Sequence, residues 1–145
     1  MRTKTNKKID TKDNKGNING YLVPIYNIND KFHEEGKEPQ QVYLTVVHEG
    51  ASKGPHLHYI RTGCFTCIKG NIKVITKEKG TYCEYFSGED YNYMSIIIET
   101  GISAIIQNIG IGEAFVLNMP SPAWTSSQND EHTDDFSDYF TKQKI

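Results

Sequence analysis

Short β-rich segments separated by turns fill most of the chain, and this pattern leaves few folds open to it. The segments are rich in β-branched and aromatic residues and recur roughly every 8–12 residues. Turn-forming pairs such as Gly70-Asn71, Lys79-Gly80 and Thr100-Gly101 separate them. We expect strands over 21–28, 41–48, 56–60, 64–69, 72–77, 82–87, 95–99, 104–109 and 114–118. Because no long helical pattern precedes Asp130, the sequence predicts an all-β domain, a single jelly roll built of antiparallel strands.

Composition divides the 145 residues into three parts. Residues 1–20 are polar and basic without periodicity, as in a flexible arm, although contact with an anionic ligand or a partner subunit is the alternative. Residues 21–125 hold the strands and are long enough for one core. Residues 126–145 form an acidic tail that has room for one short helix at most.

Charge and cysteine content restrict the function classes. The formal net charge is −2, so nothing electrostatic indicates a nucleic acid or a membrane surface as partner. No apolar run approaches the roughly 18 residues of a membrane span, and the basic N-terminus lacks the apolar stretch of a secretory signal. Three cysteines, an odd number, argue against a disulfide framework and favour the reducing cytoplasm. Cys64 and Cys67 lie three residues apart on a predicted strand, so we expect one thiol inside and one outside.

His56 and His58 are the strongest candidates for chemistry. Residues at i and i+2 of a strand share one face, and a small barrel can direct that face into its mouth. Three interpretations remain open at this point. The imidazoles are satisfied polar groups at a strand end, or two ligands of a metal, or an acid–base pair acting on a bound molecule.

The segment from Gly50 through His56-Leu-His58 to Gly70 resembles the first sequence motif of the cupin superfamily, whose fold is the jelly roll. Metal-binding cupins place a Glu at the positions held here by Thr62 or Gly63, and a His on a late strand. The chain has neither, and no His lies between His58 and His132. The resemblance therefore implies a site without a metal or other cofactor, and a metal-dependent cupin with an atypical ligand set is the alternative.

Residues 41–75 resemble the nucleotide-sugar branch of cupins, the dTDP-4-dehydrorhamnose 3,5-epimerases and dTDP-sugar 3,4-ketoisomerases. The matches are Lys53-Gly54-Pro55-His56, the second His at His58, and Val42-Tyr43 on the preceding strand. The resemblance implies that His56 is the catalytic base, that His58 assists it, and that Tyr43 binds the sugar or donates a proton. The expected substrate-binding residues are Arg61 for the pyrophosphate, together with Lys53, Thr62 and Asn118. Arg61 has an alternative interpretation as a solvated arginine beside a turn.

The epimerases carry a tyrosine acid on a late strand, and the best match here is Leu117. Its absence favours a 3,4-ketoisomerase, which moves a proton along one face, over a 3,5-epimerase. We therefore expect metal-independent isomerisation of a dTDP-linked 4-keto-6-deoxysugar for surface-polysaccharide synthesis. We also expect a homodimer paired through edge strands such as the one at Tyr21. The rival from another class is a non-catalytic cupin that binds a sugar or nucleotide sugar.

Overall fold

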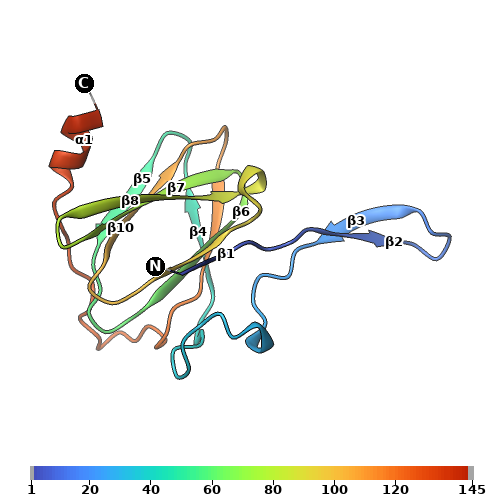
Figure 1. Cartoon of the computed structure of the whole chain (residues 1–145), viewed down its shortest axis with the longest axis horizontal. Helices are drawn as coiled ribbons and strands as arrows, with labels where there is room; N and C mark the ends of the chain where they lie inside the picture. Colours follow the sequence, from blue (N-terminus) through green and yellow to red (C-terminus); the bar gives the residue numbers. More distant parts are fainter. Residues whose placement is uncertain (1, 144–145) are drawn as a thin grey trace.

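A computed structural model of the chain describes residues 2–143 and shows two antiparallel sheets packed face to face (Figure 1). The larger sheet has the strand order β1-β9-β6-β11-β4, and the smaller has the order β5-β10-β7-β8. A separate hairpin, β2-β3, projects from the body. The predicted all-β jelly-roll architecture is confirmed. No helix within the described residues is long and apolar enough to cross a bilayer.

The strands mostly follow the predicted segments, with shifts of one to a few residues at their ends. Their bounds are β1 Thr3–Lys4, β2 Ile9–Lys12, β3 Ile18–Leu22, β4 Tyr43–Val47, β5 Ser52–His56, β6 Gly63–Lys69, β7 Asn71–Glu78, β8 Thr81–Gly88, β9 Ser95–Ile98, β10 Ser103–Asn108 and β11 Ala114–Asn118. The short helical elements are η1 Ile28–Asp30, η2 Glu89–Tyr91 and α1 Ser137–Gln143.

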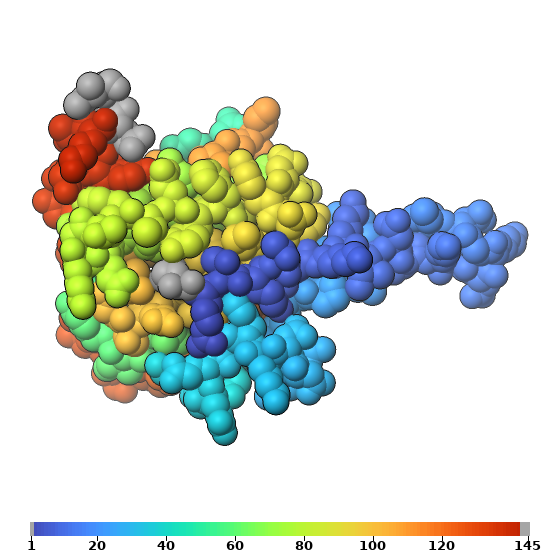
Figure 2. All heavy atoms as spheres, viewed as in Figure 1, coloured from blue at the N-terminus to red at the C-terminus, as the bar shows by residue number. Residues whose placement is uncertain are grey.

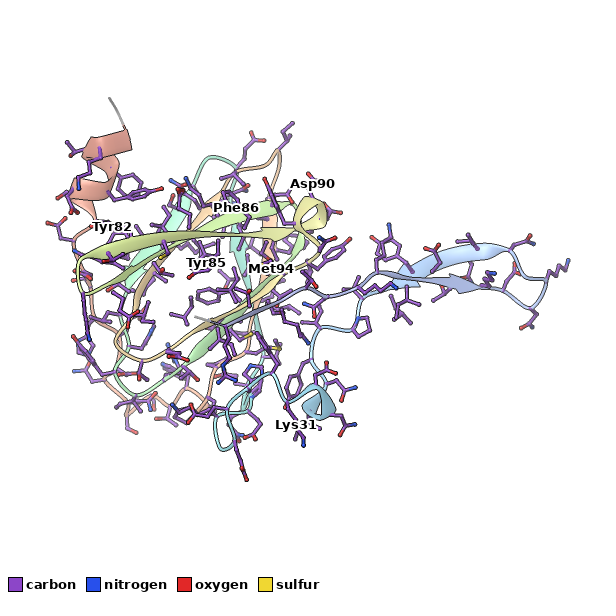
Figure 3. All side chains as sticks on the ribbon, in the orientation of Figure 1. Lys31, Tyr82, Tyr85, Phe86, Asp90 and Met94 are labelled. Atoms are coloured by element: carbon purple, nitrogen blue, oxygen red, sulfur yellow. The ribbon has the colours of Figure 1, made fainter. Side chains whose placement is uncertain are left out.

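The core lies between the two sheets and is built by alternation along the strands. Val116 of β11, Cys67 of β6 and Val74 of β7 are fully buried in it. Tyr85 and Met94 pack against this cluster from the side of β8 and the turn before β9 (Figure 3). Side chains at i and i+2 therefore face the core while their neighbours face outward, which is the pattern that the alternating sequence encodes.

The two cysteines of β6 point to opposite sides of the larger sheet. Cys67 lies in the core between the sheets, whereas Cys64 packs in a second cluster against Ile25 and Phe32, which cover the outer face. Burial raises the pKa of each thiol to about 12. Both thiols are therefore protonated at neutral pH. Because they lie on opposite sides of the sheet, they cannot bind one metal ion together.

The N-terminal segment is more structured than its composition suggests. β1 pairs with β9 and so completes the larger sheet, while β2 and β3 form the projecting hairpin (Figures 1 and 2). The turn of this hairpin is made by Asp13, whose carboxylate accepts backbone N–H groups of Lys15 and Asn17. The strand expected over 21–28 accordingly ends at Leu22, and a loop with η1 follows.

The acidic tail packs on the outer face of the smaller sheet. Phe136 and Tyr139 are buried against Ile75 and Ile105, and the ring of Tyr82 on β8 contacts both aromatic rings (Figure 3). The one short helix of the tail is α1. On the way to α1, the tail passes the barrel end that carries the predicted histidines.

Candidate functional site

Several strand ends meet at one end of the barrel. Asn118, the last residue of β11, lies opposite Tyr43, the first residue of β4. His56 ends β5 where that strand meets the start of β10. The β9–β10 turn lies beside it, since the Gly101 N–H donates to the His58 carbonyl at 2.8 Å. The fold therefore brings His56, His58, Tyr43 and Asn118 to the same end of the barrel.

A cavity of about 560 Å³ opens at this end and is of the size of small-molecule sites. Tyr43 and Arg61 line it, together with Gln41, Trp124 and residues 128–131. The indole of Trp124 is 56% exposed, and its backbone N–H donates to the Gln41 side chain at 2.9 Å. The cavity thus combines an aromatic face, a guanidinium and carboxylates.

His56 is paired with a carboxylate from the tail. Its Nδ1 lies 2.8 Å from Oε1 of Glu131, and its side chain is 45% exposed. Glu131 fixes the tautomer with the proton on Nδ1, which leaves the Nε2 lone pair available. Gly54, two residues earlier, has φ of +109°, and a Cβ there would lie 2.6 Å from the Ala104 carbonyl oxygen. Glycine is therefore required at this position for β5 to bring His56 to the site.

His58 does not lie on a strand beside His56, because β5 ends at His56. The segment expected to be a strand over 56–60 is instead a turn. The imidazole Nε2 of His58 lies 2.9 Å from Nη2 of Arg61. Arginine has only donors, so Nε2 of His58 accepts and its proton resides on Nδ1. Burial lowers the pKa of His58, and the positive charge of Arg61 lowers it further. At neutral pH this imidazole is uncharged.

Asp130 holds the turn that carries His58 and Arg61. It is 3% exposed and accepts the backbone N–H groups of Tyr59 and Ile60 on Oδ1 and of Arg61 on Oδ2, at 2.9–3.0 Å. Burial alone would raise the pKa of this carboxyl, but the three N–H donors and His58 outweigh it and hold the pKa below its usual value. At neutral pH the Asp130 carboxylate is therefore ionised and holds the backbone of the turn through these three hydrogen bonds.

Tyr43 and Asn118 form the other side of the site. The Asn118 Nδ2 donates to the Tyr43 hydroxyl oxygen at 2.6 Å, so the Tyr43 O–H is free to donate to a ligand. The Oδ1 of Asn118 is buried without a hydrogen-bond partner among residues 2–143. Leu117 occupies the opposite face of β11 from the buried Val116, so the position matched to the tyrosine acid faces away from the barrel interior.

Of the predicted site residues, only Tyr43 and Arg61 line the cavity itself. His56, His58 and Asn118 lie beside it, and the predicted substrate-binding residues Thr62 and Lys53 do not line it either. The Thr62 side chain is buried, and its hydroxyl donates to the Ser121 carbonyl at 3.2 Å. Lys53 is exposed on β5, and within the described residues its ammonium makes no hydrogen bond or ion pair. The sequence did not single out Glu131 or Asp130, which lie in the segment expected to be an acidic tail.

Other parts of the described chain offer no stronger site. Residues 2–143 contain no group of three or more His, Cys, Asp or Glu side chains that could hold a metal ion. A second cavity of about 380 Å³ lies within residues 26–38 and contains none of the predicted residues. His33 lines it, with both ring nitrogens buried and lacking a hydrogen-bond partner in the part of the chain described.

Comparison with known proteins identifies one family model and several solved structures that are similar to this chain. The family model "FdtA: WxcM-like, C-terminal" matches residues 7–144. No curated protein sequence matches the chain. Among solved structures, a dTDP sugar isomerase from Desulfovibrio desulfuricans G20 superposes with a TM-score of 0.80 at 15% identity, covering 96% of this chain and 86% of its own.

Two further structures are similar over nearly the whole chain. QdtA, a sugar 3,4-ketoisomerase from Thermoanaerobacterium thermosaccharolyticum in complex with TDP, has a TM-score of 0.66 at 17% identity and covers 99% of this chain and 95% of its own. ChmJ, a 3'-monoepimerase from Streptomyces bikiniensis in complex with dTDP-quinovose, has a TM-score of 0.73 at 15% identity, with coverages of 95% and 71%. At these identities the similarity establishes the fold.

Proposed function

Because the chain belongs to the FdtA family (WxcM-like, C-terminal), we propose that it is an enzyme that isomerises or epimerises a nucleotide-linked 4-keto-6-deoxysugar by acid–base catalysis. The observation that carries this proposal is the contact between Nδ1 of His56 and Glu131 at the edge of the cavity. When the imidazole is neutral, this contact places its proton on Nδ1 and leaves Nε2 with a free lone pair, which is what a general base requires.

Shift of the keto group from C4 to C3 accounts for the groups on both sides of the site. His56 takes the proton from C3, and the Tyr43 O–H protonates the oxygen on C4, so that an enediol forms. His56 then returns its proton to C4 while the Tyr43 phenolate takes the proton from the oxygen on C3, which becomes the new ketone. Each group ends in its starting state. The Asn118 N–H donated to Tyr43 stabilises the phenolate in between.

The 3,4-ketoisomerase is favoured over the 3,5-epimerase. Epimerisation at two carbons needs an acid on the sugar face opposite the base, and position 117 faces away from the barrel interior. The one-face reaction of the ketoisomerase needs no acid at position 117, because the Tyr43 O–H can act as the proton donor. For the substrate we propose a dTDP-linked sugar, with Arg61 contacting the diphosphate and Trp124 stacking on the base. Unpaired Cys64, Cys67 and Cys83 favour the cytoplasm, and surface-polysaccharide synthesis is the pathway we propose.

Proton NMR in deuterated water with dTDP-4-keto-6-deoxyglucose tests the function. We expect the keto signal to move to C3 and deuterium to enter at C4, the carbon that gains a proton when the enediol collapses. Binding without exchange would identify the chain as a non-catalytic cupin. Turnover that a chelator abolishes, with stoichiometric metal in the purified protein, would replace this mechanism by a metal-dependent one.

Glu131 is a positioning residue for His56, and Glu131→Gln is expected to lower kcat at least roughly tenfold with little change in KM. The reason is that the amide no longer selects the tautomer with the proton on Nδ1 of His56. The nitrogen-15 shifts of the His56 ring report the tautomer directly. Unchanged shifts together with unchanged kcat would show that the contact is not used in catalysis.

We also propose that the chain is a homodimer. The β2–β3 hairpin projects from the body (Figure 2). It exposes Ile18 and Leu22, and Leu44 is exposed on β4, an edge strand of the larger sheet. A hairpin with uncovered apolar side chains and a free apolar edge on the same molecule are self-complementary across a two-fold axis.

Light scattering of the wild type and of Ile18→Lys/Leu22→Lys tests the dimer. We expect a dimer at micromolar concentration and at least a tenfold higher dissociation constant for the double variant, which corresponds to roughly 1.4 kcal/mol. Lys12→Ala on the same hairpin is the matched control. A wild-type monomer at these concentrations, or an unaffected double variant, would contradict this assembly.

A further inference from the structure

Arg61 engages the one ring nitrogen of His58 that could accept a proton. The Nη2 group lies 2.9 Å from Nε2 of His58, and a guanidinium can only donate. The lone pair of Nε2 is therefore already used in the free protein. An imidazole in this arrangement cannot act as a base until the guanidinium moves away or donates to another acceptor.

The same guanidinium also faces the cavity. Arg61 lines the 560 Å³ space together with Tyr43 and Trp124, so its remaining N–H groups are within reach of a molecule that enters. Its backbone is fixed independently, because Asp130 accepts the Arg61 N–H at 2.9 Å. The side chain can therefore change partner while the turn beneath it stays in place.

The charges around His58 determine how this change of partner shifts the pKa of His58. Burial, Arg61 and His56 lower the pKa of His58, whereas Asp130 and Glu131 raise it. If an anion neutralises the charge of Arg61, the influence of that guanidinium on His58 is lost while the two carboxylates remain. Proton affinity at His58 then rises.

We propose that Arg61 is an anion-operated latch that holds the Nε2 lone pair of His58 in the free protein and releases it when a phosphate or diphosphate group in the cavity takes the guanidinium. The inference rests on the proposed function for the source of the anion, because a nucleotide sugar carries a diphosphate. A planar guanidinium prefers a bidentate phosphate to a single imidazole nitrogen. The second histidine then becomes basic only when the part of the substrate that does not react is bound.

Titration of the histidine rings by NMR, with inorganic pyrophosphate as the probe, tests the latch in the intact chain. We expect pyrophosphate to move the titration midpoint of His58 to higher pH and to shift its Nε2 resonance away from the hydrogen-bonded value. His33 and His48 are internal controls. His33 has a pKa lowered by burial and by Lys4 and Arg2, not by Arg61, and His48 contacts Glu113 at the other end of β4.

Arg61→Gln separates the latch from a general effect of the anion. In this variant the midpoint of His58 should already lie higher than in the wild type, and pyrophosphate should bind about tenfold more weakly and move it no further. Three results would each overturn the proposal: no binding of pyrophosphate to the wild type, binding that leaves His58 unmoved, or a midpoint in Arg61→Gln equal to that of the wild type. Because pyrophosphate carries no sugar, these outcomes are independent of whether the chain turns over a 4-keto sugar.

Discussion

Replacement of His56 by asparagine is expected to lower kcat by about 10²- to 10⁴-fold while the affinity for dTDP stays within a few-fold. Asparagine keeps an N–H that can donate to Glu131, so the contact that fixes the tail survives, but it has no lone pair able to take a proton from carbon. The loss should therefore fall on the chemical step. Single-turnover rates and calorimetric binding of dTDP measure the two quantities separately.

His48→Asn is the matched control for this substitution. His48 contacts Glu113 through Nδ1 at 2.9 Å, close to the 2.8 Å between His56 and Glu131, but it lies at the other end of β4 from Tyr43. Activity of this variant should equal that of the wild type. Retained turnover in His56→Asn, or a loss of dTDP affinity that parallels the loss of rate, would mean that His56 binds the ligand and does not remove the proton.

Most strands of the barrel could be predicted from the sequence, because the alternation of apolar and polar residues and the turn-forming residues indicate the same strand positions. β11 occupies the predicted range 114–118, and β6 to β10 deviate by at most a few residues. The predictions fail where local signals are weak. The β2–β3 hairpin has no buried face that an alternating pattern could mark, and its turn depends on the Asp13 carboxylate, a contact that no periodicity reveals. β5 ends at His56 and not at Ile60 because Asp130, far away in sequence, accepts the backbone N–H groups of Tyr59, Ile60 and Arg61.

The site was predictable on the motif side and not on the tail side. His56, Tyr43 and Asn118 lie at strand ends on one end of the barrel, as their motif and strand positions indicate. His58 and Arg61 reach the same end from the segment after β5, which the sequence predicts to be a strand. Asp130 and Glu131 were missed, because their contacts bridge about 70 residues of sequence. An acidic run near a C-terminus is usually solvated, and only tertiary packing of Phe136 and Tyr139 brings this one back to the barrel.

Asp130→Asn is expected to lower the free energy of unfolding by about 2 to 3 kcal/mol. The buried carboxylate accepts three backbone N–H groups, and an amide replaces one acceptor oxygen by a donor that opposes the Arg61 N–H or its neighbours. A loss of this size corresponds to a fall in Tm of roughly 5 to 12 °C in a chain of this length. Urea denaturation measures the free energy of unfolding. Asp13→Asn is the control, because the Asp13 carboxylate accepts backbone N–H groups in an exposed turn and its replacement should cost clearly less.

The pH dependence of the free energy of unfolding tests whether Asp130 stabilises the turn through its negative charge. The pKa of Asp130 in the folded chain lies below the ordinary 3.8 that applies when the chain is unfolded. Its contribution is therefore fully present above pH 3.8 and is lost as the pH falls through the folded value. The difference in stability between wild type and Asp130→Asn should accordingly be constant near neutrality and shrink in acid. A difference that persists unchanged below the folded pKa would show that the three N–H groups do not depend on an ionised carboxylate, and the turn that presents Arg61 and His58 would then be held by packing alone.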